Sequence, residues 1–377
     1  MNLMFSKQTI FKNFYLKKTS FKKKKEVLKN FKNLIKSKNP ILSSLDKSYK
    51  DNYNKKFISK FKNSNQFTLI GMGGSILGAR AIYNFLNLKL KNFVFIDNLS
   101  HNFSKKKSLR KNTNIIISKS GNTLETISNA NLFIGKDHKN IFITENKKSY
   151  LMDLANKLKS EVVHHNNFIG GRYSVFSEVG MLPAELMGYD PIKFRRLNQI
   201  IKNKSYINSL IQNVLNILSL IKKKKFNSII LNYDEKSNDL FHWYQQLVAE
   251  SLGKKGSGIL PMVSTMPKDN HSLMQYYLDG KKNNFFTFFF VKDGNSSKIK
   301  KNEIMNSHFY LKNKKMNDIL YSQYIATEKV FRTKKIPFRS FIIKKRTEES
   351  LAELFAFFIF ETILLANAMK INPYDQP

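Results

Sequence analysis

Three consecutive isoleucines, Ile115–Ile117, restrict the possible folds of this chain more than any other feature. A β-branched run without polar alternation predicts a strand buried on both faces, as in a parallel sheet. A polar turn of hydroxyl side chains and one glycine follows at 118–123, and a helical pattern begins near Leu124. This order places backbone N–H groups and a helix N-terminus at the carboxyl edge of the sheet, so the turn predicts an anion site that suits a phosphate. The turn alone fits ordinary helix capping by Ser or Thr as well.

A second turn of the same kind lies upstream. Thr68–Ile70 leads into Gly71–Ser75, and a helical run follows at Ile76–Leu86. The turn at 118–123 is not a P-loop, because the Gly-Lys-Ser/Thr ending is missing. The dinucleotide fingerprint also fails, since Ile76 stands where its third glycine belongs. We therefore rank dinucleotide binding low and interpret Asp97 as an ordinary strand-end residue.

Strands alternate with helices from residue 67 onward, which predicts parallel sheets covered on both faces. The fold class is therefore α/β, with ligands at the carboxyl ends of the strands. We predict a helical N-terminal segment at 1–64 packed across the first sheet, α/β domains at 65–195 and 196–346, and a C-terminal segment at 347–377. The predicted strands are 67–70, 93–96, 114–117, 140–144 and 161–163 in the first domain, and 228–233, 259–263, 285–291 and 339–343 in the second.

The last predicted helix, at 348–370, is apolar over most of its surface, so the protein or a partner chain must cover it. No stretch of about 18 apolar residues lacks a charged or polar interruption, so we predict no membrane span. The N-terminus lacks an uninterrupted apolar core, which argues against a signal peptide. The absence of cysteine excludes disulfides and thiolate sites and agrees with a cytoplasmic protein.

The formal net charge is +38. Such a charge ordinarily suggests a nucleic-acid partner. Here the lysines are spread along the chain together with an excess of Asn, Ile and Phe, which indicates a compositional bias. The lysine runs also lack the interleaved aromatic residues of a single-strand groove. We therefore expect no nucleic-acid partner.

Five motifs in this order resemble the glucose-6-phosphate isomerase family, whose members have two domains of the sugar isomerase fold. They are GMGGSILG, SKSGNTLET, GGRYSVFSEVG, AESLGKKGSG and NPYDQP, and the resemblance runs from about Thr68 to Pro377. It implies α-β-α domains of the sugar isomerase type. It also implies reversible isomerisation of glucose 6-phosphate and fructose 6-phosphate through a cis-enediol, with no cofactor. His164 and His165 form a pair, but no acidic residue at ligand spacing accompanies them, so we predict no metal.

The resemblance also assigns catalytic roles. Glu250 matches the family's catalytic base, although spacing alone gives no reason to prefer it over Glu178 or Glu185. Arg172 matches the arginine that faces the developing enediolate. His271 matches the histidine that opens the sugar ring, and a near-neutral pKa suits such a proton shuttle. In the family this histidine comes from the neighbouring subunit, which implies a homodimer.

Further positions match the family's substrate and phosphate contacts. They are Ser75, Ser118, Lys119, Ser120, Thr123, Gly171, Gln246 and Gln376. The family also has a lysine about seven residues beyond the closing glutamine, and the sequence stops at Pro377 before that position. We expect a longer native chain, an isomerase that works without this lysine, or a lost activity. Loss of one such cation weakens turnover on the order of a hundredfold.

Three other functions remain open. An isomerase that also accepts mannose 6-phosphate differs only in small details of pocket shape. A sugar-phosphate sensor without turnover would keep the phosphate turn but needs no base, so the joint presence of Glu250, Arg172 and His271 disfavours it. A nucleic-acid-binding role rests on charge alone and ranks third.

Overall fold

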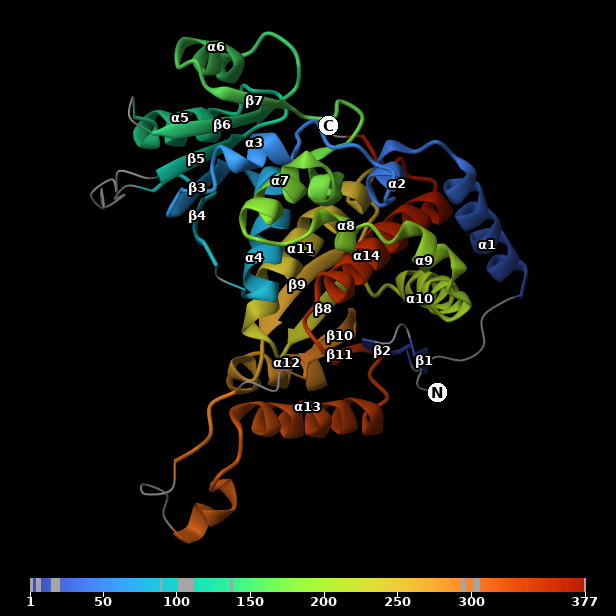
Figure 1. Cartoon of the computed structure of the whole chain (residues 1–377). Helices are drawn as coiled ribbons and strands as arrows, with labels where there is room; N and C mark the ends of the chain where they lie inside the picture. Colours follow the sequence, from blue (N-terminus) through green and yellow to red (C-terminus); the bar gives the residue numbers. More distant parts are fainter. Residues whose placement is uncertain are drawn as a thin grey trace.

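Two sheets lie on opposite sides of a shared layer of helices in the computed structural model (Figure 1). The structure describes residues 3–4, 8–14, 21–88, 90–100, 112–135, 138–292, 296–300 and 306–375. The sugar isomerase fold expected from the resemblance requires parallel sheets with helices on both sides, and the arrangement meets that requirement.

The first sheet has five strands, all parallel. In spatial order they are β4 (Asn92–Ile96), β3 (Gln66–Gly71), β5 (Asn112–Ile117), β6 (Lys139–Thr144) and β7 (Glu161–His164). The five predicted strands are confirmed. Side chains alternate between the faces, so Ile116 packs toward one helical layer while Ile115 and Ile117 pack toward the other.

The second sheet has six strands, of which four are parallel. In spatial order they are β1 (Leu3–Met4), β2 (Thr9–Lys12), β11 (Phe338–Ile343), β10 (Asn284–Val291), β8 (Asn227–Asn232) and β9 (Leu260–Thr265). The prediction of an entirely helical segment at 1–64 is wrong at β1 and β2. β2 pairs antiparallel with β11 and covers an edge that would otherwise expose unpaired backbone groups.

Helices form three layers around the sheets (Figure 1). The outer face of the first sheet carries α5 (Leu124–Phe133) and α6 (Tyr150–Lys157), and the outer face of the second carries α12 (Met274–Asp279) and α13 (Met316–Thr333). The layer between the sheets includes α4 (Leu77–Leu86), α7 (Glu178–Leu186), α10 (Lys204–Lys222), α11 (Asn238–Leu252) and α14 (Glu348–Met369). One continuous hydrophobic core runs from this middle layer to the inner faces of both sheets.

The shorter elements connect these layers. They are α2 (Pro40–Ser44), α3 (Lys55–Ser59), α8 (Pro191–Phe194), α9 (Leu197–Lys202) and the 3-10 turns η1 (Gly73–Ser75), η2 (Gly171–Phe176), η3 (Glu235–Ser237), η4 (Lys268–His271) and η6 (Asn306–Leu311).

The predicted C-terminal helix is confirmed as α14. Length and composition alone would let α14 cross a membrane, yet 89% of its most apolar window is buried inside the protein. It contacts α10, α11 and α8, so this helix is a core element.

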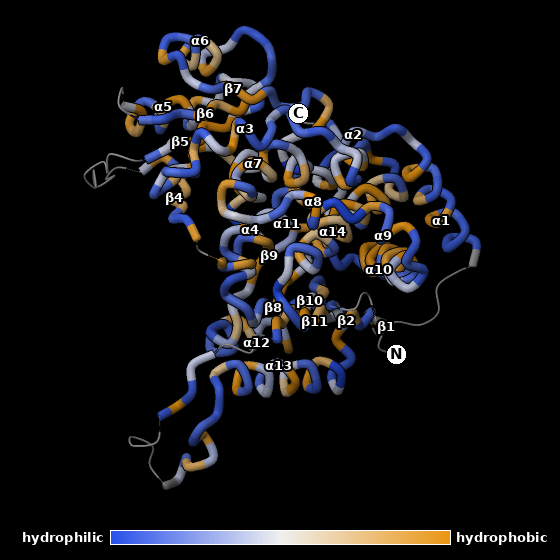
Figure 2. Tube along the Cα trace, viewed as in Figure 1, coloured by the Kyte–Doolittle hydropathy of each residue, from blue (hydrophilic) through white to orange (hydrophobic). Residues whose placement is uncertain are grey.

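The long N-terminal helix is α1 (Phe21–Lys36), which packs on α10 and α14. The expectation that this helix crosses the first sheet is therefore wrong. Its apolar side chains Val27, Phe31 and Leu34 are buried, while its lysines remain exposed. Figure 2 shows the same contrast, with a mostly hydrophilic α1 on the outside and hydrophobic segments in the strands and α10.

Candidate active site

Two polar turns begin side by side at the carboxyl edge of the first sheet. β3 and β5 are neighbours, and Gly71 at the end of one pairs with Ile117 at the end of the other. The glycine turn 71–75 and the serine turn 118–123 therefore start next to each other, at the carboxyl edge where the sequence predicted ligands. Ser75 lies in η1, directly before α4, and is partly buried.

Hydroxyl groups converge within the serine turn. The Ser118 Oγ lies 2.8 Å from the Thr123 Oγ1 and 3.4 Å from the Ser120 Oγ. Thr123 precedes α5 but its side chain makes no capping hydrogen bond, so ordinary capping does not account for this hydroxyl. Gly121 has a φ of +68°, and a Cβ there would lie 2.2 Å from the Ser149 Oγ. The turn thus gathers hydroxyls at the N-terminus of α5, where an anion is stabilised.

Lys119 is held beside this turn by two acceptors. Its Nζ donates to the Asn167 carbonyl at 2.8 Å and lies 3.5 Å from a Glu145 carboxylate oxygen. Glu145 also pairs with Lys147. Burial raises the pKa of Glu145, but the hydrogen bond from Lys147 and the charges of both lysines outweigh it, so the net pKa is lowered. A charged carboxylate therefore fixes the lysine and partly offsets its charge.

The glycine turn contacts two other parts of the site. A Cβ on Gly74 would lie 2.1 Å from the Gly171 carbonyl carbon and 2.6 Å from the Arg172 nitrogen. A Cβ on Gly73 would lie 2.7 Å from the Gln246 Nε2. Glycine is needed at 74 because backbone atoms occupy the space, and it is favoured at 73 by a φ of +52°. The glycine turn thereby joins the Gly-Gly-Arg turn to helix α11.

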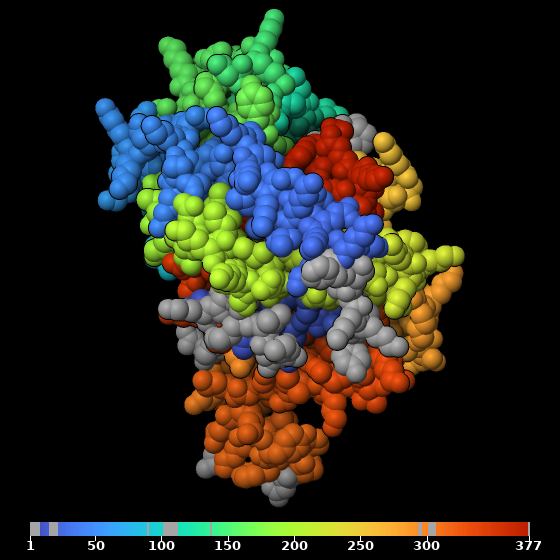
Figure 3. Space-filling view, turned by 90° about the vertical axis from the view of Figure 1, so that its right-hand side faces the viewer, coloured from blue at the N-terminus to red at the C-terminus, as the bar shows by residue number. Residues whose placement is uncertain are grey.

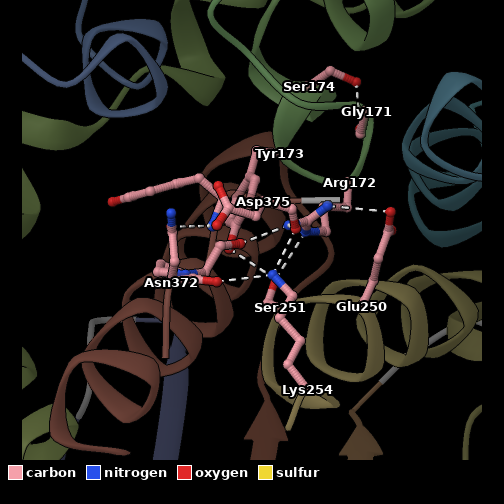
Figure 4. A network of polar contacts seen from close by, with 11 residues as sticks. Gly171, Arg172, Tyr173, Ser174, Glu250, Ser251, Lys254, Asn372 and Asp375 are labelled. Atoms are coloured by element: carbon pink, nitrogen blue, oxygen red, sulfur yellow. Dashed lines mark hydrogen bonds and ion pairs between the residues drawn. The ribbon is translucent and has the colours of Figure 1, made fainter. Parts of the chain in front are cut away.

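Arg172 and Glu250 form an ion pair in the middle of the candidate site (Figure 4). The Arg172 Nη1 lies 3.1 Å from the Glu250 Oε1, and the arginine side chain is almost completely buried. The other carboxylate oxygen, Glu250 Oε2, is buried and has no hydrogen-bond partner among the residues described. One helical turn earlier on α11, the Gln246 Oε1 is also buried without such a partner. A carboxylate with one free oxygen, next to a fixed guanidinium, can move a proton while the guanidinium stabilises an oxyanion.

Two residues that the sequence analysis did not single out hold the arginine. The Arg172 Nε donates to the Ser251 Oγ at 2.9 Å, and the Tyr173 hydroxyl lies 2.8 Å from the same oxygen. The only signal in the sequence was their position directly after Arg172 and Glu250. Neither neighbour could be assigned a contact until the fold brought the two segments together.

The other two candidate acids lie in different surroundings. Glu178 is completely buried, and its two oxygens accept hydrogen bonds from the Asn166 N–H and the Tyr49 hydroxyl. Burial chiefly raises the pKa of Glu185, which lines an apolar cavity of about 360 Å³ beside α3. Of these three acids, Glu250 is the one paired with Arg172.

His271 lies apart from this ion pair within the chain. It ends η4, its side chain is exposed, and η4 contacts β9 and α12. Asp269 orders the turn, because its Oδ2 accepts from the Ser264 Oγ and the Thr265 N–H, both at 2.8 Å. In the described part of the chain, His271 has no hydrogen bond or ion pair with Glu250 or Arg172.

Two more residues named from the sequence remain to be placed. Gln376 lies outside the described residues, which end at Asp375. Asp97 ends its strand in an ion pair with Arg80 at 2.5 Å, and Arg80 also contacts Asp239 at the start of α11. This contact explains Asp97 as a strand-end residue that helps to join α4 to α11.

Solved structures with the same arrangement of elements identify the fold. A hypothetical protein from Thermus thermophilus superposes with a TM-score of 0.79 at 20% identity, covering 94% of this chain and 91% of that chain. A glucose-6-phosphate isomerase from Chlamydia trachomatis superposes with a TM-score of 0.76 at 16% identity, covering 98% of this chain and 86% of that chain. The fold is that of the phosphosugar isomerases.

Sequence comparison narrows this class to one family. Residues 55–265 match the model of the phosphoglucose isomerase family. The glucose-6-phosphate isomerase of Methanocaldococcus jannaschii is 33% identical over 343 residues, which cover 85% of this chain and 84% of that protein. The enzyme of the same name from Mycoplasmoides gallisepticum is 30% identical, covering 82% of this chain and 79% of that protein. The chain belongs to the phosphoglucose isomerase family.

Proposed function

We propose that the protein interconverts glucose 6-phosphate and fructose 6-phosphate through a cis-enediol intermediate, as a step of glycolysis and gluconeogenesis in the cytoplasm. The relatives named glucose-6-phosphate isomerase support this reaction. The observation that carries the proposal is the Glu250 carboxylate, with Oε1 held by Arg172 and Oε2 buried without a hydrogen-bond partner in the described residues. Such an oxygen is available to a substrate proton.

The two halves of the site divide the reaction between them. Ser75 and the serine turn, with Ser118, Lys119, Ser120 and Thr123, hold the phosphate. Glu250 removes a proton from one carbon of the open-chain sugar and returns it to the neighbouring carbon. The Arg172 guanidinium stabilises the enediolate oxygen that forms between these two steps. The Gln246 Oε1, which has no hydrogen-bond partner among the described residues, accepts a hydrogen bond from a sugar hydroxyl. No cofactor is needed because the reaction only moves protons within one sugar, one between the two carbons and one between their oxygens.

The experiment is an enzyme-coupled assay with fructose 6-phosphate, together with the same conversion in D2O followed by NMR. We expect turnover and incorporation of solvent deuterium at the carbon that receives the proton. A chain that binds fructose 6-phosphate in calorimetry without turnover would be a sugar-phosphate sensor and would overturn the proposal. Mannose 6-phosphate is assayed in parallel, because turnover of that sugar would broaden the substrate range.

We also propose a homodimer in which His271 of a second copy completes each site by opening the sugar ring. Two observations support this proposal: the His271 side chain is exposed, and η4 contacts β9 and α12. The two elements that contact η4 also carry exposed apolar side chains, namely Leu260 and Met262 on β9 and Tyr276 on α12. The segment around η6 also projects from the body of the molecule, at the bottom of Figure 3.

Mixing two inactive variants tests the shared site. Glu250→Gln and His271→Ala chains are each expected to be inactive, whereas unfolding and refolding them together should restore about a quarter of the wild-type activity. Half of the dimers then contain both chains, and each such dimer has one intact site. Mixtures that remain inactive, or a monomer in sedimentation analysis, would contradict the shared site.

A further inference from the structure

The segment that follows α14 lies directly on the ion pair in the middle of the candidate site. Its backbone carbonyls at Asn372, Pro373 and Asp375 face two cationic side chains (Figure 4). Tyr374 in the same segment receives a hydrogen bond from the Asn39 Nδ2 at 2.9 Å, which ties the segment to the start of α2. In Figure 3 the C-terminal part of the chain lies at the surface next to the N-terminal helices. We call residues 372–375 the closing segment.

The closing segment accepts hydrogen bonds from Arg172, the arginine of the proposed reaction. The Arg172 Nη2 donates to the Pro373 carbonyl at 2.6 Å and to the Asp375 carbonyl at 3.0 Å. The Nε is hydrogen-bonded to Ser251 and the Nη1 lies next to Glu250. All three nitrogens of the guanidinium therefore contact neighbouring groups. The closing segment is thus one of the supports that set the direction of the Nη1 toward Glu250.

A chain of hydroxyls connects the same three elements. The Arg172 Nε donates to the Ser251 Oγ, so this oxygen has its own proton available for the Tyr173 hydroxyl oxygen at 2.8 Å. The Tyr173 hydroxyl then donates to the Pro373 carbonyl at 3.1 Å. Tyr173 and Ser251 are both buried. The closing segment is therefore hydrogen-bonded to η2 and, through Ser251, to α11.

Lys254 supplies the second cation. It lies in the turn after α11, and its Nζ donates to the Asn372 carbonyl at 2.8 Å and to the Asp375 carbonyl at 2.5 Å. The Asp375 carbonyl is therefore shared between Lys254 and Arg172 and separates the two positive charges. Partial burial, and next the charge of Arg172, lower the pKa of Lys254. The next lysine, Lys255, is exposed and has none of these contacts among the described residues.

We propose that Lys254 is a positioning residue, which holds the closing segment against Arg172 and thereby fixes the guanidinium in line with Glu250. This inference rests on the proposed function, because the benefit of a fixed guanidinium is the isomerisation. Lys254 itself touches backbone carbonyls, so its effect on the reaction passes through the closing segment and Arg172. Small displacements of a group that stabilises charge are costly, since such stabilisation depends on preorganised geometry.

Three variants test the proposal. Lys254→Met removes the ammonium group and keeps the length of the side chain, and Lys254→Arg keeps two donors for the carbonyls. Lys255→Met removes the same charge one residue away. We expect Lys254→Met to lower kcat for fructose 6-phosphate by about tenfold to thirtyfold with KM within about twofold. Lys254→Arg should recover most of kcat, and Lys255→Met should match the wild type.

Hydrogen exchange of the backbone amides in 370–375 provides a readout that does not depend on turnover. It should accelerate in Lys254→Met and stay unchanged in Lys255→Met. A lower kcat with unchanged exchange would overturn the positioning role, and a rise in KM alone would show that Lys254 binds substrate instead. If the wild type does not isomerise the sugar but Lys254→Met still accelerates exchange, the proposed function fails while the anchoring of the closing segment stands. If exchange is also unchanged, both fail.

Discussion

The serine turn and the Arg172–Glu250 pair are built in opposite ways. The serine turn draws all of its hydroxyls from six consecutive residues between one strand and one helix. The pair is assembled from η2 and α11 and is supported by the closing segment, which lies about 200 residues from Arg172 along the chain. A phosphate keeps its charge throughout the proposed reaction, so contacts to it contribute equally before and during the transition state. The pair meets the negative charge of the enediolate, which develops only during the proposed reaction. The first region should therefore control KM and the second kcat.

The largest expected effect is at Glu250. Glu250→Gln removes the base but keeps the size of the side chain, so kcat should fall by about a thousandfold while KM stays within about threefold. Steady-state assays in both directions measure it. The matched control is Glu235→Gln, which removes a carboxylate from an exposed site. Unchanged turnover in Glu250→Gln would make the proposed mechanism wrong.

Gly74→Ala disrupts the contact between the glycine turn and η2, which connects the two regions. The added Cβ would overlap the Gly171 backbone, so the glycine turn and η2 must separate. We expect kcat/KM to fall by about a hundredfold with both kcat and KM affected, because the two regions lose their common spacing. Gly135→Ala is the control, since the nearest atom there is 3.5 Å away. An effect confined to KM would mean that this contact serves the phosphate alone.

His165 follows β7, close enough to the serine turn that the charge of Lys119 acts on it, so it tests the first region through stability. Burial lowers the pKa of His165 to about 4. Its contribution to stability is therefore complete above pH 6.5 and is lost as the pH falls toward 4, because the unfolded chain binds the proton more readily. Between pH 7.5 and pH 5 we expect a loss of about 2 kcal/mol, which His165→Gln should abolish. Urea unfolding at both pH values measures it. His164→Gln, at an exposed neighbour, should leave the pH dependence intact.

The smallest expected effect is at Ser118. Ser118→Ala removes one hydroxyl from the serine turn, so KM for fructose 6-phosphate should rise about tenfold while kcat stays within about twofold. Ser128→Ala, on α5, should behave as the wild type. A drop in kcat without a change in KM would contradict the division of labour between the two regions.

Most of the fold followed from local sequence. Strands such as the one containing Ile115–Ile117 are buried on both faces, so an uninterrupted apolar run predicts them. β2 was missed because four residues are too few to show a period, and its pairing with β11 is a contact across more than 300 residues. α1 lies in the segment that was predicted to be helical, yet its apolar stripe carries no information on which partner covers it.

The parts of the candidate site that come from neighbouring residues in the sequence were easier to predict than those that come from distant segments. The serine turn has its hydroxyls, its glycine and the start of its helix next to one another in the sequence. This order was enough to predict an anion site there. Glu250 was chosen over Glu178 and Glu185 by resemblance, and only the fold shows that it faces Arg172. The contacts of Ser251 and Lys254 could not be predicted at all, because they depend on the path of the closing segment.

The contact between Gly74 and Gly171 is one-sided. A Cβ on Gly74 would overlap the Gly171 carbonyl group, whereas a Cβ on Gly171 would meet its nearest atom, the Gly74 Cα, at an ordinary 3.8 Å. The backbone at 171 therefore leaves no room for a side chain at 74, whereas position 171 itself has room for a Cβ. The two glycines are under different constraints. A relative with a side chain at 74 must already have displaced its Gly-Gly-Arg turn, and with it the arginine. The identity of one small residue therefore constrains the position of the Arg172 backbone, almost one hundred residues away in the chain.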